Sequence, residues 1–130
     1  MRVEVYWNFN RKCYSVRALE GPSKGRVIGH RERVNIHNAK FVVRKAGRDR
    51  VRREKRKNVH AFVRGDLDCL GVLDEPTVGV GYNPYQWDSF MSFEPARSGK
   101  GMIIKPITEA RRVSLYVSGP ENRSNIRALV

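Results

Sequence analysis

The sequence predicts a mainly β (α+β) fold, a small antiparallel sheet or partly closed barrel with one short basic helix between strands. The first observation is period-two alternation at the start of the chain, where Val3, Val5 and Trp7 alternate with polar residues. Such alternation is typical of a half-buried strand. The second is that Gly, Pro and Asn recur between short runs rich in β-branched and aromatic residues. With 130 residues, the chain is expected to form a single domain over residues 1–130.

The pattern places short strands along most of the chain. The segment Asn8–Lys12 carries turn residues, so the first two strands should form a hairpin. His37 and Asn38 are expected to separate two further strands, and the chain from about residue 119 is expected to be a flexible C-terminal tail. The expected strands are 3–9, 13–17, 26–28, 33–36, 39–44, 58–64, 102–107 and 112–118.

Residues 44–57 form a strongly basic run. These 14 residues hold nine basic and two acidic side chains, a net charge of +7 out of +13 for the whole chain. Arg, Lys and Glu favour helix, and Arg50 and Glu54 have the i,i+4 spacing of a helical ion pair, as do Asp49 and Arg53. Because Val51 is the only sizeable apolar residue, the run is either an exposed helical arm at about 46–57 or a loop that orders on binding, and helix propensity favours the arm.

The excess of positive charge points to a phosphate-bearing partner. A net +13, from 26 Lys and Arg against 13 Asp and Glu, attracts nucleic acids, nucleotides or anionic membranes. No apolar run approaches the roughly 18 residues that span a bilayer, and the N-terminus lacks the apolar core of a signal peptide. We therefore expect a cytoplasmic protein that does not bind membranes, with Cys13 and Cys69 as reduced thiols.

Arginines in and near the basic run are the candidate phosphate ligands. A guanidinium group presents forked donors that match phosphate oxygens, and on a continuous helix Arg48, Arg52 and Arg56 would share one face. The alternative is a solvated charged face. The predicted phosphate-binding residues of the run are Arg48, Arg52, Arg53, Arg56 and Lys57.

An aromatic segment follows at residues 79–93. It holds five of the twelve aromatic residues of the chain, and its glycines and amides suit a loop that approaches a ligand closely. The predicted residues for stacking on a base and reading its edge are Tyr82, Asn83, Tyr85 and Trp87. The alternative is that these rings pack into the core, as we expect for Phe90 and Phe93.

Signals for catalysis or metal binding are weak. His30, His37 and His60 stand apart, without the spacing of a metal site, so we predict no metal and no cofactor. The least improbable enzyme is a metal-independent nuclease that uses His60, but a partly buried structural histidine is the more common case.

Three strings resemble a family of small hypothetical phage and prophage proteins. They are residues 40–48, residues 53–65 with the segment KNVHAFVRG, and Tyr82–Tyr85 with residues 88–90, and the resemblance covers about residues 1–93. The chain also resembles the phage Thoeris anti-defence sponge proteins, small β-rich oligomers that sequester nucleotide signals such as cyclic ADP-ribose derivatives. That resemblance implies arginines and an aromatic ring near the ligand, which Arg26, Tyr82 and Asn83 would supply.

These observations favour a non-enzymatic protein that binds a phosphate-bearing nucleotide, in the host cytoplasm if the chain is phage-encoded. The resemblance extends this to an anti-defence protein that sequesters a nucleotide immune signal. A homo-oligomer is expected because so short a chain has few long loops to enclose a ligand. Two alternatives stay open: a nucleic-acid-binding protein with a basic arm and aromatic stacking, and a protein–protein inhibitor of a host defence factor.

Overall fold

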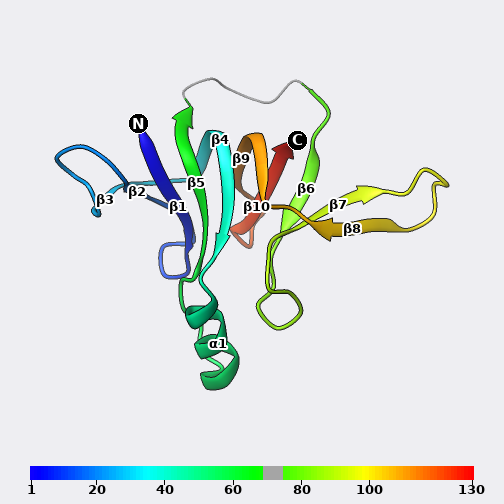
Figure 1. The fold of residues 1–130 in the computed structure, drawn as a ribbon, viewed down its shortest axis with the longest axis horizontal. Helices are drawn as coiled ribbons and strands as arrows, with labels where there is room; N and C mark the ends of the chain where they lie inside the picture. Colours follow the sequence, from blue (N-terminus) through cyan, green and yellow to red (C-terminus); the bar gives the residue numbers. More distant parts are fainter. Residues whose placement is uncertain (69–74) are drawn as a thin grey trace.

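One antiparallel sheet dominates the fold of the computed structural model, which describes residues 1–68 and 75–130 (Figure 1). This part of the chain forms ten strands in the order β3-β2-β1-β5-β4-β9-β10-β6-β7-β8, together with one helix. The mainly β fold and the antiparallel sheet are thereby confirmed, and the sheet is open. The elements are β1 (Arg2–Asn8), β2 (Cys13–Ala18), β3 (Val27–Arg31), β4 (Arg33–Val43), α1 (Lys45–Glu54), β5 (Ala61–Asp68), β6 (Val78–Gly81), β7 (Met91–Pro95), β8 (Met102–Pro106), β9 (Glu109–Ser118) and β10 (Arg123–Leu129).

The hydrophobic core lies on one face of the sheet, because side chains alternate between the two faces along each strand. In β1, Val3 and Val5 are buried among the core residues, as the period-two pattern predicts. They pair in register with Ala18 and Val16 of β2, which point to the same face. The inner faces of β4, β5 and β9 continue this apolar surface.

Strand β4 does not break where the sequence predicts a break. His37 and Asn38 lie at a β-bulge, where the register with β5 shifts between His37 and Lys40. Asn38 has a φ of 52°, a left-handed conformation that Asn tolerates better than most residues. The bulge inserts an extra residue and keeps Ile36 and Ala39 both buried. One long strand therefore replaces the two short ones.

The sheet curls strongly around its apolar face. Tyr14 of β2 bonds through its hydroxyl to Ser124 and to the carbonyl oxygen of Asn125, the latter at 3.1 Å. Both partners belong to β10, although four strands separate β2 from β10 in the sheet. A flat sheet cannot bring these strands together, so the inner face is concave. The edge strands β3 and β8 do not pair with each other.

Helix α1 is shorter than the predicted arm. Lys55 ends it in a left-handed conformation with φ 58°, and its N–H donates to the carbonyl of Val51. The helix lies beyond one end of the sheet (Figure 1). It forms the expected Arg50–Glu54 ion pair at 3.1 Å, whereas Asp49 pairs with Lys45 instead of Arg53.

The C-terminal part of the chain differs most from the prediction. The predicted flexible tail is wrong for Arg123–Leu129, which form β10 between β9 and β6. Strand β7 was also not predicted.

The predicted strand 58–64 begins only at Ala61 and extends to Asp68. Cys13 is a half-buried free thiol, and Cys69 lies outside the described residues.

Candidate ligand-binding pocket

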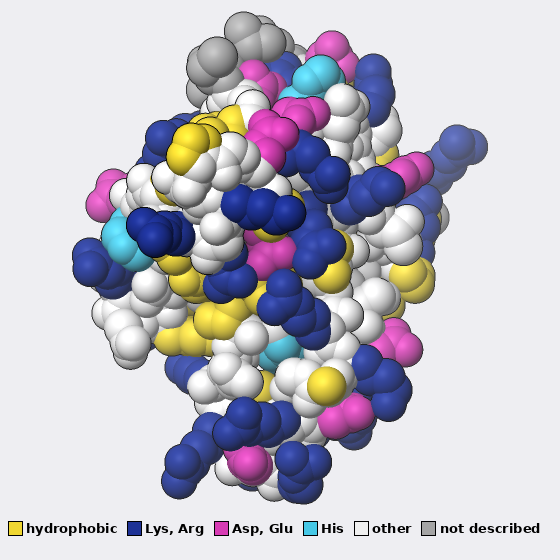
Figure 2. All heavy atoms as spheres, turned by 60° about the vertical axis from the view of Figure 1, so that its left-hand side comes forward, with side chains coloured by type: hydrophobic (Ala, Val, Ile, Leu, Met, Phe, Trp, Pro, Cys, Tyr) yellow, Lys and Arg dark blue, Asp and Glu magenta, His cyan; other side chains and the backbone are white. Residues whose placement is uncertain are grey.

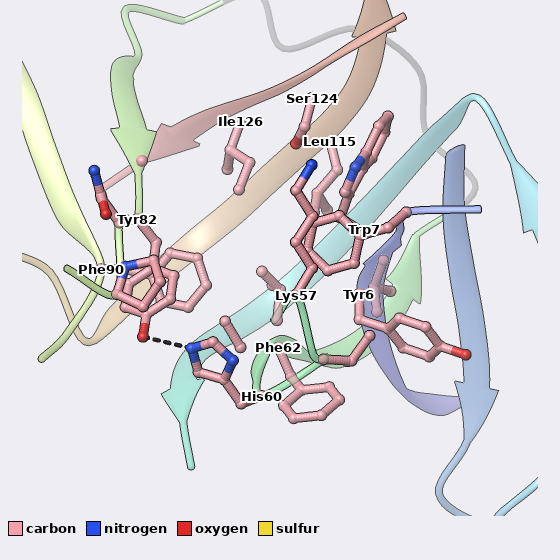
Figure 3. A pocket seen from close by; sticks show the side chains of 18 of the residues that line it. Tyr6, Trp7, Lys57, His60, Phe62, Tyr82, Phe90, Leu115, Ser124 and Ile126 are labelled. Carbon is pink, nitrogen blue, oxygen red and sulfur yellow. Dashed lines mark hydrogen bonds between the residues drawn. The ribbon is translucent and has the colours of Figure 1, made fainter. Parts of the chain in front are cut away.

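A pocket of about 480 Å³ opens at the end of the curled sheet next to α1 (Figure 3). Its floor consists of inward-facing side chains from five strands, β1, β5, β6, β9 and β10. They are Val5, Val63, Val80, Leu115 and Ile126. The curl of the sheet gathers these residues, because each alone is an ordinary core position of its strand.

Aromatic side chains form much of the pocket wall. The Trp7 and Tyr14 rings meet edge to face, with their centroids 5.1 Å apart. Across the pocket, the Tyr82 ring packs against Phe90 at 5.3 Å, and Phe9 also lines the cavity. A pocket with such walls suits a planar, apolar or aromatic ligand group.

His60 and Tyr82 form a polar pair in this wall (Figure 3). His60 is buried, and its Nδ1 lies 2.7 Å from the carbonyl oxygen of Asn58. Since a carbonyl can only accept, Nδ1–H is the donor, and in this tautomer Nε2 is an acceptor. The Tyr82 hydroxyl lies 2.7 Å from Nε2 and donates to it.

Burial raises the pKa of two of the four tyrosines that line the pocket. It raises the pKa of Tyr82 to about 12, against the opposing effect of Arg48 and with a small contribution from Asp88. Burial likewise raises the pKa of Tyr14 to about 12, although its hydrogen bonds to Ser124 and Asn125 act in the other direction. Both hydroxyls are therefore hydrogen-bond donors and not anions at neutral pH.

Positive charge lies at the pocket mouth. The Lys57 side chain lines the pocket, and its Nζ lies 5.5 Å from the centre of the Phe9 ring. Lys55 Nζ lies 5.2 Å from the centre of the Tyr85 ring. Such contacts between a cation and an aromatic face hold both ammonium groups beside rings that a ligand can also contact.

The helix reaches the pocket through a narrow contact surface. Val51 is its buried residue and lines the pocket. Gly47 lies directly against His60, so that a Cβ at this position would be 2.5 Å from the His60 Cβ. Arg48 Nε donates to the carbonyl of Trp87 at 2.8 Å, which ties the helix to the loop after β6.

A second group of arginines lies on the outer face of the sheet. Glu4 is buried, and its carboxylate accepts from Arg64 at 2.7 Å, Arg44 at 3.3 Å and Arg17 at 3.4 Å. Cross-strand register aligns Glu4 with Arg17 and Arg64. Figure 2 shows Lys and Arg side chains over much of one face of the molecule.

Comparison with known proteins places the chain in a phage family. The family model described as Mycobacterium phage L5 gene 82 protein matches residues 1–116. The gene 82 protein of Mycobacterium phage L5 is 48% identical over 99 residues, which cover 70% of this chain and 77% of the relative. The chain belongs to the phage L5 gene 82 protein family.

The predicted resemblance to small phage proteins is thus confirmed, and all three strings that carry it lie within the matched residues. No solved structure matches the chain. Within residues 1–68 and 75–130, no helix is long and apolar enough to cross a membrane. The same residues hold no cluster of three or more His, Cys, Asp or Glu side chains that could bind a metal.

In this member of the gene 82 family, the pocket brings together only some of the predicted ligand residues. Lys57, Tyr82, Asn83 and Tyr85 line it. The Asn83 Oδ1 accepts the N–H of Tyr85 at 2.9 Å, so this oxygen holds the turn. The amide nitrogen of Asn83 can still donate to a ligand.

The other predicted residues lie outside the pocket lining. Trp87 packs on Phe93, with the ring centroids 5.7 Å apart. Arg52, Arg53 and Arg56 are exposed. Because the helix ends at Glu54, Arg48, Arg52 and Arg56 do not share one helical face.

Arg26 is remote from the pocket. It lies in the turn between β2 and β3, at the end of β2 opposite Tyr14, and the antiparallel strands place that turn away from α1 (Figure 1). The sequence reasoning missed Trp7, Phe9, Tyr14 and Ser124. The two turn-proximal rings, Trp7 and Phe9, were visible as aromatic residues at the end of the first strand.

Proposed function

We propose that this protein is a non-enzymatic phage protein that binds a phosphate-bearing nucleotide. The base would enter the aromatic pocket and the phosphate would remain at the mouth, near Lys57 and Lys55. The observation that supports the proposal most is an aromatic pocket of about 480 Å³ with ammonium groups at its rim. Pockets for small ligands commonly measure roughly 300–1,000 Å³.

The lining supports binding of a small ligand, because most of it is apolar or aromatic. His60 Nδ1 and Nε2 both have protein partners, Asn58 and Tyr82, and these hydrogen bonds hold the Tyr82 ring in the pocket wall. In an infected host, such a protein would act by sequestering a nucleotide immune signal, which is the anti-defence activity that we propose for it.

Calorimetry against a nucleotide panel tests the proposal. The panel contains mononucleotides, cyclic dinucleotides and cyclic ADP-ribose isomers. We expect at least one ligand to bind with a dissociation constant below about 10 μM, which corresponds to a binding free energy of about −7 kcal/mol. Failure of every member to bind more tightly than the high-micromolar range would refute the proposal.

Substitutions locate the ligand. Lys57→Glu should weaken binding at least tenfold, because it reverses a charge at the mouth. Arg26→Glu makes the same charge change at the remote β2–β3 turn and should have little effect. Tyr85→Ala removes a ring that is 49% exposed, and loss of one stacking contact, about 1–3 kcal/mol, corresponds to roughly 5- to 150-fold weaker binding. Equal effects of Lys57→Glu and Arg26→Glu would place the ligand elsewhere.

Binding of nucleic acid is the second candidate, and the exposed arginines outside the pocket favour it. Among the described residues, no ion pair involves Arg52, Arg53 or Arg56. Contacts of these side chains with a phosphate backbone predict a steep loss of affinity with salt. Reversal of all three charges should then abolish binding of a single-stranded oligonucleotide, while a mononucleotide bound in the pocket should be little affected.

A further inference from the structure

The hairpin of β7 and β8 extends from the body of the protein (Figure 1). Strand β8 is the last strand of the sheet and pairs only with β7. All five of its residues are exposed. Its free edge therefore offers backbone groups that another strand can bind.

Three consecutive apolar side chains of β8 are in contact with solvent. Met102 is 55% exposed, Ile103 45% and Ile104 49%. Because neighbours in a strand point to opposite faces, both faces of β8 carry apolar surface. Natural edge strands usually avoid such surface with charges, bulges or proline.

The other edge strand, β3, carries a β-bulge, whereas β8 has none over Met102–Ile104. Strand β3 contains the exposed Val27 and Ile28, but its register with β2 shifts between Val16 and Arg17. A bulge bends and twists an edge strand and interrupts regular pairing. The register of β8 with β7 runs without a shift from Met102 to Pro106.

The backbone directions in β8 follow from two hydrogen bonds at its ends. Ala96 N–H donates to the carbonyl of Gly101, and Ile107 N–H donates to the carbonyl of Phe90. Hydrogen-bonded pairs alternate with non-hydrogen-bonded pairs in an antiparallel ladder. Residues 101, 103, 105 and 107 therefore direct their backbone groups toward β7. Met102 and Ile104 direct theirs to the free edge, and Pro106, which has no N–H, occupies an outward position.

We propose that two copies of this protein dimerise by antiparallel pairing of β8 with β8 of the second copy. A two-fold axis at Ile103 places Ile103 opposite Ile103 of the partner subunit. The same register places Met102 opposite Ile104 of the partner subunit and Ile104 opposite Met102 of the partner subunit. Each of these two Met102–Ile104 pairs exchanges two backbone hydrogen bonds, whereas the Ile103 pair exchanges none. The pairing is self-complementary in both hydrogen bonds and apolar side chains, as an isologous interface requires.

A second copy fits this edge better than an unrelated strand. Each side chain on the apolar part of β8 meets an apolar side chain of the partner, and Lys105 lies opposite Gly101, so the two lysines do not face each other. Pairing of β8 with β3 of another copy would instead be head-to-tail and would lead to open chains. Because the paired segment is short, we expect a reversible dimer with a dissociation constant of roughly micromolar order. The inference specifies the expected homo-oligomer and does not depend on nucleotide binding.

Sedimentation equilibrium of the full chain at concentrations from about 1 to 300 μM tests the proposal. The unmodified protein should pass from monomer to dimer over this range. Ile103→Lys should shift the dissociation constant upward at least tenfold, because it places two like charges opposite each other. Val27→Lys is the matched control, since it adds the same charge at an exposed apolar position of the other edge. A monomer at every concentration, or equal effects of both substitutions, would overturn the proposal.

Two further variants test the register. Ile104→Pro removes an N–H that points away from β7, so the hairpin should remain while the dimer weakens. Circular dichroism checks that the variant folds. Ile103→Cys should form a disulfide between the two substituted positions under mild oxidation, because directly opposed residues of a non-hydrogen-bonded pair lie about 4.5 Å apart at Cα. Peptide mapping identifies the bond. Crosslinking through Ile104→Cys that is faster than through Ile103→Cys would refute this register.

Discussion

The contact between α1 and His60 leads to a specific prediction for Gly47→Ala. In an exposed helix, Gly→Ala stabilises the folded protein by up to about 1 kcal/mol, because Ala has the higher helix propensity. Here the new Cβ would lie 2.5 Å from the His60 Cβ, whereas carbon atoms pack at about 3.5–4.0 Å. The helix would have to withdraw by about 1 Å.

The cost of this withdrawal should exceed the gain in propensity. Insertion of a methyl group into a well-packed contact costs about 1–3 kcal/mol. We therefore expect Gly47→Ala to lower the free energy of unfolding by about 1 kcal/mol, the difference between that cost and the propensity gain. The hydrogen bond between His60 and Tyr82 should be disturbed as well, because His60 is the residue that is pushed.

Urea unfolding followed by circular dichroism measures the effect. Position 52 supplies the control, since Arg52 is an exposed residue of the same helix. Arg52→Ala should be more stable than Arg52→Gly by about 0.5–1 kcal/mol, which reports helix propensity alone. If Gly47→Ala stabilises the protein by as much as this difference, the close approach of α1 to His60 is refuted.

Three further substitutions test other parts of the structure. Glu4→Gln should lower the free energy of unfolding by about 3 kcal/mol, because three arginines lose their buried carboxylate; Glu54→Gln, which removes only a surface pair, should change it by less than about 0.5 kcal/mol. Tyr82→Phe leaves the buried His60 Nε2 without its donor and should cost about 1–2 kcal/mol in urea unfolding, while its ring still lines the pocket, so a small effect on ligand affinity is expected. The pKa of Tyr14 is raised from 10.0 to about 12 in the folded state. The stability that depends on its protonated form is therefore complete below about pH 10 and is lost as the pH rises toward 12. The two-unit shift corresponds to a loss of about 2–3 kcal/mol in the free energy of unfolding. Between pH 10 and 12, Tyr14→Phe should therefore lose stability less steeply than the unmodified protein, and parallel slopes in urea titrations would contradict the assignment.

The parts of the fold that sequence reasoning predicted are those with a strong local signal. The alternation of Val3, Val5 and Trp7 indicates β1 without reference to any other strand. Helix propensity likewise indicates α1, although the end at Glu54 depends on the left-handed conformation of Lys55. Alternation and helix propensity depend on a few neighbouring residues, so they can be recognised in the sequence without knowledge of the tertiary structure.

Strand β10 shows why other elements were missed. Arg123, Asn125 and Arg127 give the segment a polar appearance typical of a tail. Its strand conformation comes from pairing with β9 on one side and β6 on the other. Backbone hydrogen bonds in a sheet need partners from elsewhere in the chain, so a local sequence pattern does not predict them.

The candidate pocket was predicted in part for the same reason. Tyr82 and Tyr85 were identified because aromatic rings cluster in sequence near glycines. Trp7 and Tyr14 belong to the opposite wall, and each appears in sequence as an ordinary strand residue. Arg26 was expected near the ligand because of a family resemblance, but it lies at the other end of β2.

The sequence by itself determined the class of fold, the excess of positive charge and membership of a small phage family, since these depend on composition, short-range periodicity and continuous strings. Only the tertiary structure decided which of the basic residues lie near the aromatic ones. The curl of the sheet brings β2 against β10 and opens a pocket at one end. The chain after the end of α1 at Glu54 places Lys57 at the pocket mouth, while Arg52 lies on an exposed face of the helix. Charge is a property of residues, but a binding site requires a shape, and that shape comes from contacts between strands far apart in the chain.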